Sequence, residues 1–232
     1  MTAAAKAPRK KKLAKPTNLI AGPQGDEAWK SLRCGKITAS RIADVIAFKK
    51  DGSEQACRRD YRLQIVTEML TGFPTDYGFE SADMRWGREQ EPNARIIYAD
   101  LTGAKVDQIA FAQHPLIEHA GASPDGLIGK DGLLEIKCPR SFTHINYILD
   151  DVMPVDYIPQ VQWQLAATGR KWCDFMSYDP RMPEHLRVFI KHVKRDDVYI
   201  NAVTIQVNKF ISECLALVNT LASYAPALAS RG

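Results

Sequence analysis

The chain has 232 residues, 45% of them hydrophobic and 25% charged, which is the composition of a globular protein with a full core. No apolar run approaches the ~20 residues that cross a bilayer, and no apolar block follows the basic N-terminus, so we expect neither a membrane span nor a secretory signal. The five cysteines are scattered and form no CxxC pair, which favours reduced thiols in the cytoplasm and disfavours a zinc or iron–sulfur site.

The formal net charge of +4 is unevenly distributed along the chain. Residues 1–18 contain six lysines and arginines and no acid, so the rest of the chain carries a net charge of −2. We predict that residues 1–18 form a disordered basic tail, either a non-specific nucleic-acid arm or a solubilising segment, and that residues 19–232 form a single domain. A domain with this charge cannot hold DNA by bulk attraction alone.

Apolar spacing predicts the regular elements in chain order. Six stretches have helical spacing or a helix-opening signal: 26–32, near 38–40, 61–70, 86–98, 158–168 and 210–221. Glycines 72 and 169 end two of these helices. Four stretches alternate or run apolar, as strands do: 105–112, 116–119, 173–178 and 186–193. Helices on both sides of a central run of strands predict an α/β fold with a mixed central sheet flanked by helices.

Residues 121–138 are predicted to form a hairpin, and its turn decides which side chains share a face. Glu135 and Lys137 lie two apart in a strand and therefore point to the same side. A two-residue turn at Asp131 and Gly132 would place Asp125 on the opposite face. A three-residue loop at 130–132, with Gly132 in the left-handed conformation, would pair residue 125 with 137 and unite the three charged groups. We favour this loop because it also buries Ile128, Leu134 and Ile136 together.

Two carboxylates and a lysine on one face suit metal-assisted hydrolysis of a phosphodiester. Asp125 and Glu135 are the hard oxygen ligands that Mg²⁺ prefers, and two such ions ~3.5–4 Å apart can stabilise the attacking and leaving oxygens. Lys137 could hold or deprotonate the attacking water. The alternative is a surface hairpin with a salt bridge, because the pattern of Asp, then Glu-x-Lys, is short.

Six ordered blocks give this pattern a context. They are W-K-S-L-R-C-G-K-I-T-A-S at 29–40, W-G-R-E-Q-E-P-N-A-R at 86–95, S-P-D-G-L at 123–127, L-E-I-K-C-P at 134–139, Q-V-Q-W at 160–163 and Y-D-P-R-M at 178–182. Residues 26–182 thereby resemble the lambda exonuclease and phage alkaline exonuclease family of the PD-(D/E)xK nuclease superfamily. The resemblance implies a restriction-endonuclease-like core and a magnesium-dependent, processive 5′→3′ exonuclease on double-stranded DNA ends. Such an enzyme releases 5′-mononucleotides and leaves a 3′ single-stranded overhang for recombination.

The resemblance also implies a role for each matching residue of the hydrolytic centre. Asp125 and Glu135 fall on the central metal ligands, with Glu91 and the main-chain carbonyl of Ile136 completing the shells of two Mg²⁺ ions, for which Mn²⁺ could substitute. Lys137 falls on the catalytic lysine.

The helical block at 160–163 adds one more residue to that centre. Gln160 matches the glutamine of the superfamily's Q-x-x-x-Y pattern, in a catalytic and substrate-contacting role. Gln164 stands where that pattern has tyrosine, which leaves the role of this position open.

Further residues match the family's contacts with the DNA end. Arg33, Ser40 and Ser123 correspond to a pocket for the 5′-phosphate, although Ser40 alone could be a helix cap. Trp29 would stack on or position the terminal nucleotide, or else belong to the core. Met84 would be an apolar wedge at the duplex end, or else simple packing. The family's arginine after the L-E-I-K-C-P block has no direct match, because residue 143 is threonine, and Arg140 is the nearest substitute.

The resemblance finally implies partners and a location. The family forms ring-shaped homotrimers around DNA, which fits the weak charge of the body, and a phage-type single-strand annealing protein is the expected partner. We expect the protein in the cytoplasm of a bacterium or a phage-infected bacterium. Two alternatives stay open: a structure-specific or restriction-type endonuclease of the same superfamily, and a non-catalytic DNA-binding module.

Overall fold

The computed structural model describes residues 18–75 and 81–224, so the predicted basic tail lies outside the described residues except for Asn18. Nine described strands form two mixed sheets. The first sheet has the order β1 (Leu19–Ile20), β4 (Phe111–Gln113), β5 (Ala120–Ala122) and β2 (Ile37–Thr38). The second has the order β3 (Val106–Asp107), β6 (Gly126–Ile128), β7 (Gly132–Lys137), β8 (Trp172–Tyr178) and β9 (Val188–Lys194).

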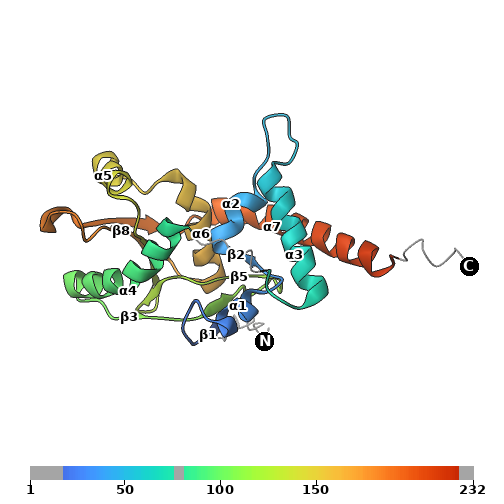
Figure 1. Cartoon of the computed structure of the whole chain (residues 1–232), viewed down its shortest axis with the longest axis horizontal. Helices are drawn as coiled ribbons and strands as arrows, with labels where there is room; N and C mark the ends of the chain where they lie inside the picture. The colour runs from blue at the N-terminus through green and yellow to red at the C-terminus, as the bar shows by residue number, and fades with distance from the viewer. Residues whose placement is uncertain (1–17, 76–80, 225–232) are drawn as a thin grey trace, which may run out of the picture.

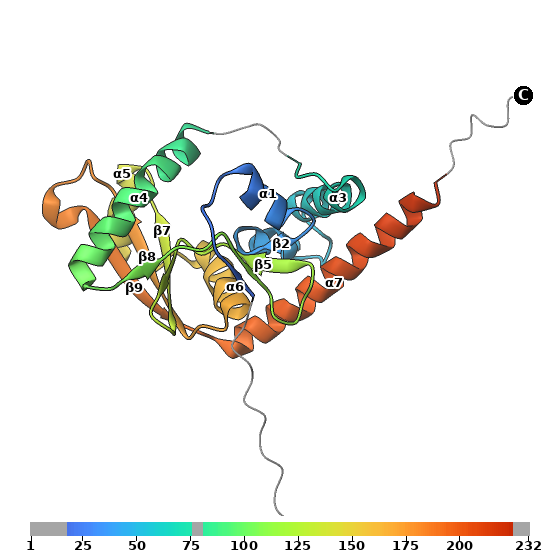
Figure 2. The ribbon, with the colours of Figure 1, turned by 90° about the horizontal axis from the view of Figure 1, so that it is seen from below.

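Helices cover and separate these sheets (Figure 1). They are α1 (Glu27–Arg33), α2 (Ile42–Val45), α3 (Ala56–Thr71), α4 (Ala82–Thr102), α5 (Ser141–Asp150), α6 (Ile158–Thr168) and α7 (Asp197–Ala222), with single turns of 3₁₀ helix at Ala39–Arg41, Val155–Tyr157 and Glu184–Leu186. Helix α6 is buried along almost its whole length and lies between the sheets (Figure 2). The mixed α/β prediction is confirmed, but the strands form two sheets around a central helix instead of one.

The second sheet has an apolar surface on each side. Leu133 and Cys173 belong to the large core that α3, α6 and α7 share with the first sheet. On the other side Leu134, Ile136 and Met176 pack against Ala94 and Tyr98 of α4. Because side chains alternate along a strand, residues 135 and 137 of β7 face the α6 side. Strands β7 and β8 are parallel, and α5 and α6 form the crossover between them.

The β6–β7 hairpin corrects the predicted turn. Ile128 pairs with Gly132 and Gly126 with Leu134, so the three-residue loop is 129–131 and the predicted register is wrong by two residues. Gly129, not Gly132, has the positive φ, at 51°. Gly132 is needed for space, because an added Cβ would lie 2.2 Å from the ring of Trp172. A shift of two residues preserves the faces of a strand, so the predicted shared face of 125, 135 and 137 survives.

Other element predictions also differ from the structure, and one helix was not predicted. Residues 116–119 form a turn instead of a strand. Helix α7 begins at Asp197 instead of 210, because Asp196 caps it through the amides of Val198 and Tyr199. Helix α5 was not predicted, and its apolar residues Phe142 and Leu149 are 63% and 75% exposed. Among the described residues, no helix combines the length and apolarity required to cross a membrane.

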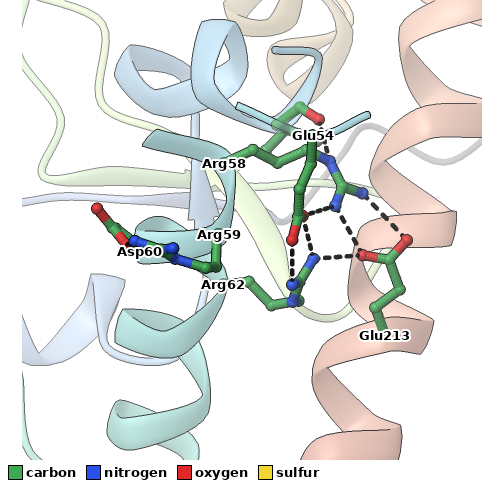
Figure 3. A network of polar contacts seen from close by, with 7 residues as sticks. Glu54, Arg58, Arg59, Asp60, Arg62 and Glu213 are labelled. Atoms are coloured by element: carbon green, nitrogen blue, oxygen red, sulfur yellow. Dashed lines mark hydrogen bonds and ion pairs between the residues drawn. The ribbon is translucent and has the colours of Figure 1, made fainter. Parts of the chain in front are cut away.

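A partly buried charge network joins α3 to α7 (Figure 3). Arg58 and Arg62 of α3 lie between Glu54, in the loop before the helix, and Glu213 of α7, with N–O distances of 2.6 to 3.1 Å. Arg58 is only 2% exposed and also donates to the carbonyl of Val45 at 3.0 Å. The network holds α3 in place, and α3 in turn forms one wall of a pocket described below.

Candidate active site

Glu135 lies on β7 facing α6 and is held by three side-chain donors. Its side chain is 1% exposed. Lys137 Nζ and Gln160 Nε2 donate to Oε1 at 2.6 and 2.5 Å, and Gln164 Nε2 donates to Oε2 at 2.6 Å. Lys137 Nζ also lies 3.4 Å from Gln160 Oε1. Both carboxylate oxygens therefore have a fixed orientation, which a site that binds and converts a substrate requires.

Asp125 lies in the bend that precedes β6, close to the other strand of the hairpin. Its Oδ2 accepts a hydrogen bond from the main-chain N of Ile136 at 2.7 Å. Its carbonyl accepts from Arg95 Nε at 2.9 Å, and Arg95 also pairs with Glu91 one turn earlier on α4. Arg95 thus connects the helical acid to the hairpin acid, and the structure brings together the predicted residues of the hydrolytic centre.

Negative charge predominates in this cluster. Burial raises the pKa of Asp125 well above its usual range, and the neighbouring carboxylates of Glu135 and Glu91 add to the effect. Burial also raises the pKa of Glu91, although Arg95 opposes it. Burial would lower the pKa of Lys137, but the carboxylates of Glu135 and Asp125 outweigh it and raise that pKa. Three carboxylates that repel one another face only two cations.

The chemistry of these donors fits a divalent metal ion. No group of three or more His, Cys, Asp or Glu side chains within the described residues is already arranged around a metal position, since Glu91 and Glu135 are engaged with their cationic and amide partners. The carboxylates of Asp125 and Glu135 are nevertheless the kind of oxygen donor that Mg²⁺ prefers, and a bound cation would relieve their repulsion.

An open cleft of about 380 Å³ borders the cluster at Glu91 and Lys137. Asp83 and Met84, in the first turn of α4, form part of its rim. Met84 is 60% exposed, so its side chain does not belong to the core. Arg140 is 63% exposed and pairs with Asp83 at 2.8 Å across the rim.

A second pocket, of about 270 Å³, lies between α1 and α3 and contains a half-buried arginine. Arg33 donates to Ser123 Oγ and to Thr38 Oγ1, each at 3.3 Å, and its guanidinium carbon lies 4.2 Å from the ring centroid of Trp29. Burial lowers the pKa of Arg33. Trp29 Nε1 donates to Ser123 Oγ at 3.0 Å, so the indole holds both the arginine and the serine. Ser40 Oγ lies 3.5 Å from Thr38 Oγ1 and caps no helix, which removes the cap alternative.

The two sites share one short segment. Ser123 belongs to the arginine pocket and Asp125 to the acidic cluster, and only Pro124 separates them. Sequence analysis did not assign Thr38 or Arg95, although Arg95 ends the W-G-R-E-Q-E-P-N-A-R block at helical spacing from Glu91. It left Gln164 open, and the structure places that side chain, fully buried, on Glu135.

A two-sheet α/β fold with an acid–lysine cluster on a hairpin beside a helical glutamine defines the nuclease class of enzyme. The chain belongs to the YqaJ-like viral recombinase domain family, whose model matches residues 28–171. It is 41% identical to the alkaline exonuclease LHK-Exo from Laribacter hongkongensis, with a TM-score of 0.78 over 85% of this chain and 96% of that chain. A structure of LHK-Exo in complex with dAMP matches equally well, with 41% identity and a TM-score of 0.78. The prediction of an exonuclease of this family is thereby confirmed.

Two further matches are more distant. A phage related exonuclease from Haemophilus somnus 129PT has a TM-score of 0.61 over 81% of this chain and 95% of that chain, and its 14% identity supports the fold alone. The uncharacterized protein R354 of Acanthamoeba polyphaga mimivirus is 25% identical over 166 residues. That match covers 66% of this chain but spans only 28% of the viral protein.

Proposed function

We propose that the protein is a magnesium-dependent, processive 5′→3′ exonuclease that acts on double-stranded DNA ends. It releases 5′-mononucleotides and leaves a 3′ single-stranded overhang for recombination. The observation that carries the proposal is the junction at residues 123–125, which places an arginine pocket directly beside an acidic, lysine-containing cluster. The complex of LHK-Exo with dAMP supports it, because dAMP is a mononucleotide of the kind that such an enzyme releases.

Asp125, Glu135 and the carbonyl of Ile136 would hold the metal, with Glu91 from α4 completing the set. When bound, Mg²⁺ or a substituting Mn²⁺ supplies stabilisation of the negative charge that develops on the phosphate, and two ions suit both reacting oxygens. Lys137 lines the cleft and Gln160 donates to the same oxygen of Glu135, and both would help to hold the attacking water. Gln164 would keep Glu135 in the orientation that this requires.

The arginine pocket would set the direction of digestion. A terminal 5′-phosphate carries more negative charge than an interior phosphodiester, and base edges carry no such polarity. Arg33 can bind it through charge-assisted hydrogen bonds, with the hydroxyls of Ser40 and Ser123 as neutral partners. Trp29 stacks on Arg33 in the structure, which favours a role in positioning the arginine.

The rim of the cleft would contact the duplex near its end. Met84 is an exposed apolar side chain at the start of α4, suited to separate the terminal base pair. Arg140 is exposed and pairs with Asp83 of this rim, and on DNA binding it would leave Asp83 and bind a phosphate of the DNA instead.

Processivity would come from a closed homotrimeric ring around the duplex. The body of the chain carries a net charge of −2, which is too little for retention by charge and compatible with retention by topology. A phage-type single-strand annealing protein would receive the 3′ overhang, in the cytoplasm of a bacterium or a phage-infected bacterium.

Digestion of matched linear and closed-circular duplexes, with and without 5′-phosphate, tests the proposal. We expect magnesium-dependent release of acid-soluble nucleotides from linear DNA, fastest with 5′-phosphate, and none from circles. Cutting of circular DNA would replace the proposal with an endonuclease, and binding without release in magnesium would replace it with a non-catalytic module.

A further inference from the structure

The Y-D-P-R-M block at 178–182 has no role in the site described so far. It begins at the end of β8, where Asp179 is fully buried. Asp179 accepts three hydrogen bonds from Arg181: from the main-chain N and Nε at 3.0 and 2.7 Å through Oδ1, and from a terminal nitrogen at 3.0 Å through Oδ2. The two-point contact gives the Arg181 guanidinium a fixed orientation.

Arg181 contacts both elements that carry the acidic cluster. The terminal nitrogen that donates to Asp179 Oδ2 also donates to the carbonyl oxygen of Pro139 at 3.0 Å, and Pro139 lies two residues after Lys137. Its guanidinium carbon lies 4.5 Å from the ring centroid of Trp86, on the same helix as Glu91. One side chain therefore bridges the exit of β7 and the first half of α4.

The first half of α4 is also attached through Asp83, in its first turn, which pairs with Arg140 at 2.8 Å. The buried residues of this helix, Ala94 and Tyr98, lie in its second half, where Arg95 also binds the hairpin. In the first half, Trp86 packs against the smaller core with an indole nitrogen that has no described hydrogen-bond partner. The contact that orients the Trp86 ring is therefore its stacking on the guanidinium of Arg181, which Asp179 holds in place.

We propose that Arg181 is a positioning residue that fixes the first half of α4 against β7 and thereby sets the place of Glu91 and the width of the cleft. Its effect on turnover rests on the function proposed above, whereas its effect on α4 does not. Lysine cannot replace it, because an ammonium lacks the planar fork that pairs with Asp179 and stacks on Trp86 at once.

Hydrogen exchange of the amides of α4 tests, independently of activity, whether Arg181 fixes this helix. In Arg181→Met and in Trp86→Leu we expect faster exchange at residues 82–90, with unchanged exchange at 94–102. Arg59→Met is the matched control, because Arg59 is an exposed arginine that pairs with Asp60 on α3. Unchanged exchange at 82–90 in both variants, or faster exchange throughout the chain, would overturn the proposal.

Kinetics then test whether this positioning serves the site. We expect kcat to fall by about 10- to 100-fold in Arg181→Met, as for misplacement of a reacting group, with a higher magnesium concentration for half-maximal rate and no rescue by Arg181→Lys. The preference for 5′-phosphorylated ends should persist, because Arg33 is untouched. If the parent is active and Arg181→Met has the same kinetics, the role of Arg181 in positioning the site is refuted, and the proposed function is not. If the parent is inactive, the proposed function is refuted, and hydrogen exchange still shows whether Arg181 fixes α4.

Discussion

Two clusters of acids and cations, each partly or wholly buried, occur among the described residues, and they differ in the balance of positive and negative charge. In the network of Glu54, Arg58, Arg62 and Glu213, two acids face two arginines, and every carboxylate oxygen has an arginine partner (Figure 3). The hydrogen bond from Arg62, against a smaller effect of burial, lowers the pKa of Glu54 to about 2.

The acidic cluster at the cleft uses the same residue types but is not balanced. Glu91, Asp125 and Glu135 face Lys137 and Arg95, and the pKa of Asp125 is raised, first by burial and then by its acidic neighbours. A balanced network stabilises a fold, whereas an excess of buried negative charge stores repulsion that a ligand can relieve. This difference in charge balance distinguishes the structural network between α3 and α7 from the candidate active site.

Removal of an acid from the cleft cluster should have the largest effect. Asp125→Ala or Glu135→Ala should lower the rate of nucleotide release by about a thousandfold or more, because several kcal/mol of charge stabilisation is lost. Neither variant should lose its circular-dichroism spectrum, and Asp125→Asn should melt no lower than the parent in EDTA, because it removes repulsion. Near-normal turnover of either alanine variant in magnesium would contradict the assignment of Asp125 and Glu135 as metal ligands.

Removal of Arg33 should change specificity more than turnover. Arg33→Ala should reduce the preference for 5′-phosphorylated over 5′-hydroxyl ends by about 10- to 100-fold, since one or two charge-assisted bonds of ~1.5–3 kcal/mol are lost. Hydrolysis at the acids should remain. The measurement is the initial rate on paired linear substrates, with Arg59→Ala as the control. An undiminished phosphate preference in Arg33→Ala would return this residue to a structural role.

Gln164 offers a sharper comparison of site and scaffold. Its Nε2 donates to Glu135, while its Oε1 is buried without a partner among the described residues. Gln164→Leu should lower turnover by about tenfold, as loss of a supporting partner does, and should also lower the melting temperature in EDTA, because the buried Oε2 of Glu135 loses its donor. Reduced stability with unchanged turnover would make this residue part of the scaffold.

The balanced network should give the smallest effect, on stability alone. Glu54→Gln should lower the free energy of unfolding at pH 7 by about 1 kcal/mol, as partly exposed ion pairs do, without changing turnover. Because folding lowers the pKa of Glu54 from 4.5 to about 2, its contribution is complete above pH 4.5 and disappears as the pH falls through about 2. Melting curves of parent and variant should therefore converge in acid, and a constant difference down to pH 2 would contradict the assigned cause.

Local signals in the sequence predicted the parts that depend on local chemistry. The helix at 158–168 is confirmed at both ends, because Gly169 supplies the left-handed cap. The shared face of Asp125 and Glu135 follows from the two-residue period of a strand, which tolerates the error in register. The choice between Gly129 and Gly132 as the turn glycine depended on Trp172, forty residues away, which no local pattern contains.

Contacts between distant elements could not be predicted in the same way. The separation of the strands into two sheets depends on α6, and the local sequence that predicted this helix does not show that it is buried between two sheets. Arg181 and Arg95 have the composition of surface cations, and only the packing of α4 against the hairpin gives them partners. The ordered blocks located both residues, but the blocks alone did not assign them a contact.

The melting temperature as a function of magnesium concentration tests the central claim most directly, because a ligand that binds only the folded state stabilises it increasingly once its concentration exceeds the dissociation constant. We predict a melting temperature that rises with the logarithm of the magnesium concentration for the parent and for Glu54→Gln, and no rise for Asp125→Asn. An equal rise in Asp125→Asn, or none in the parent, would contradict the assignment of the unbalanced cluster as the metal-binding centre.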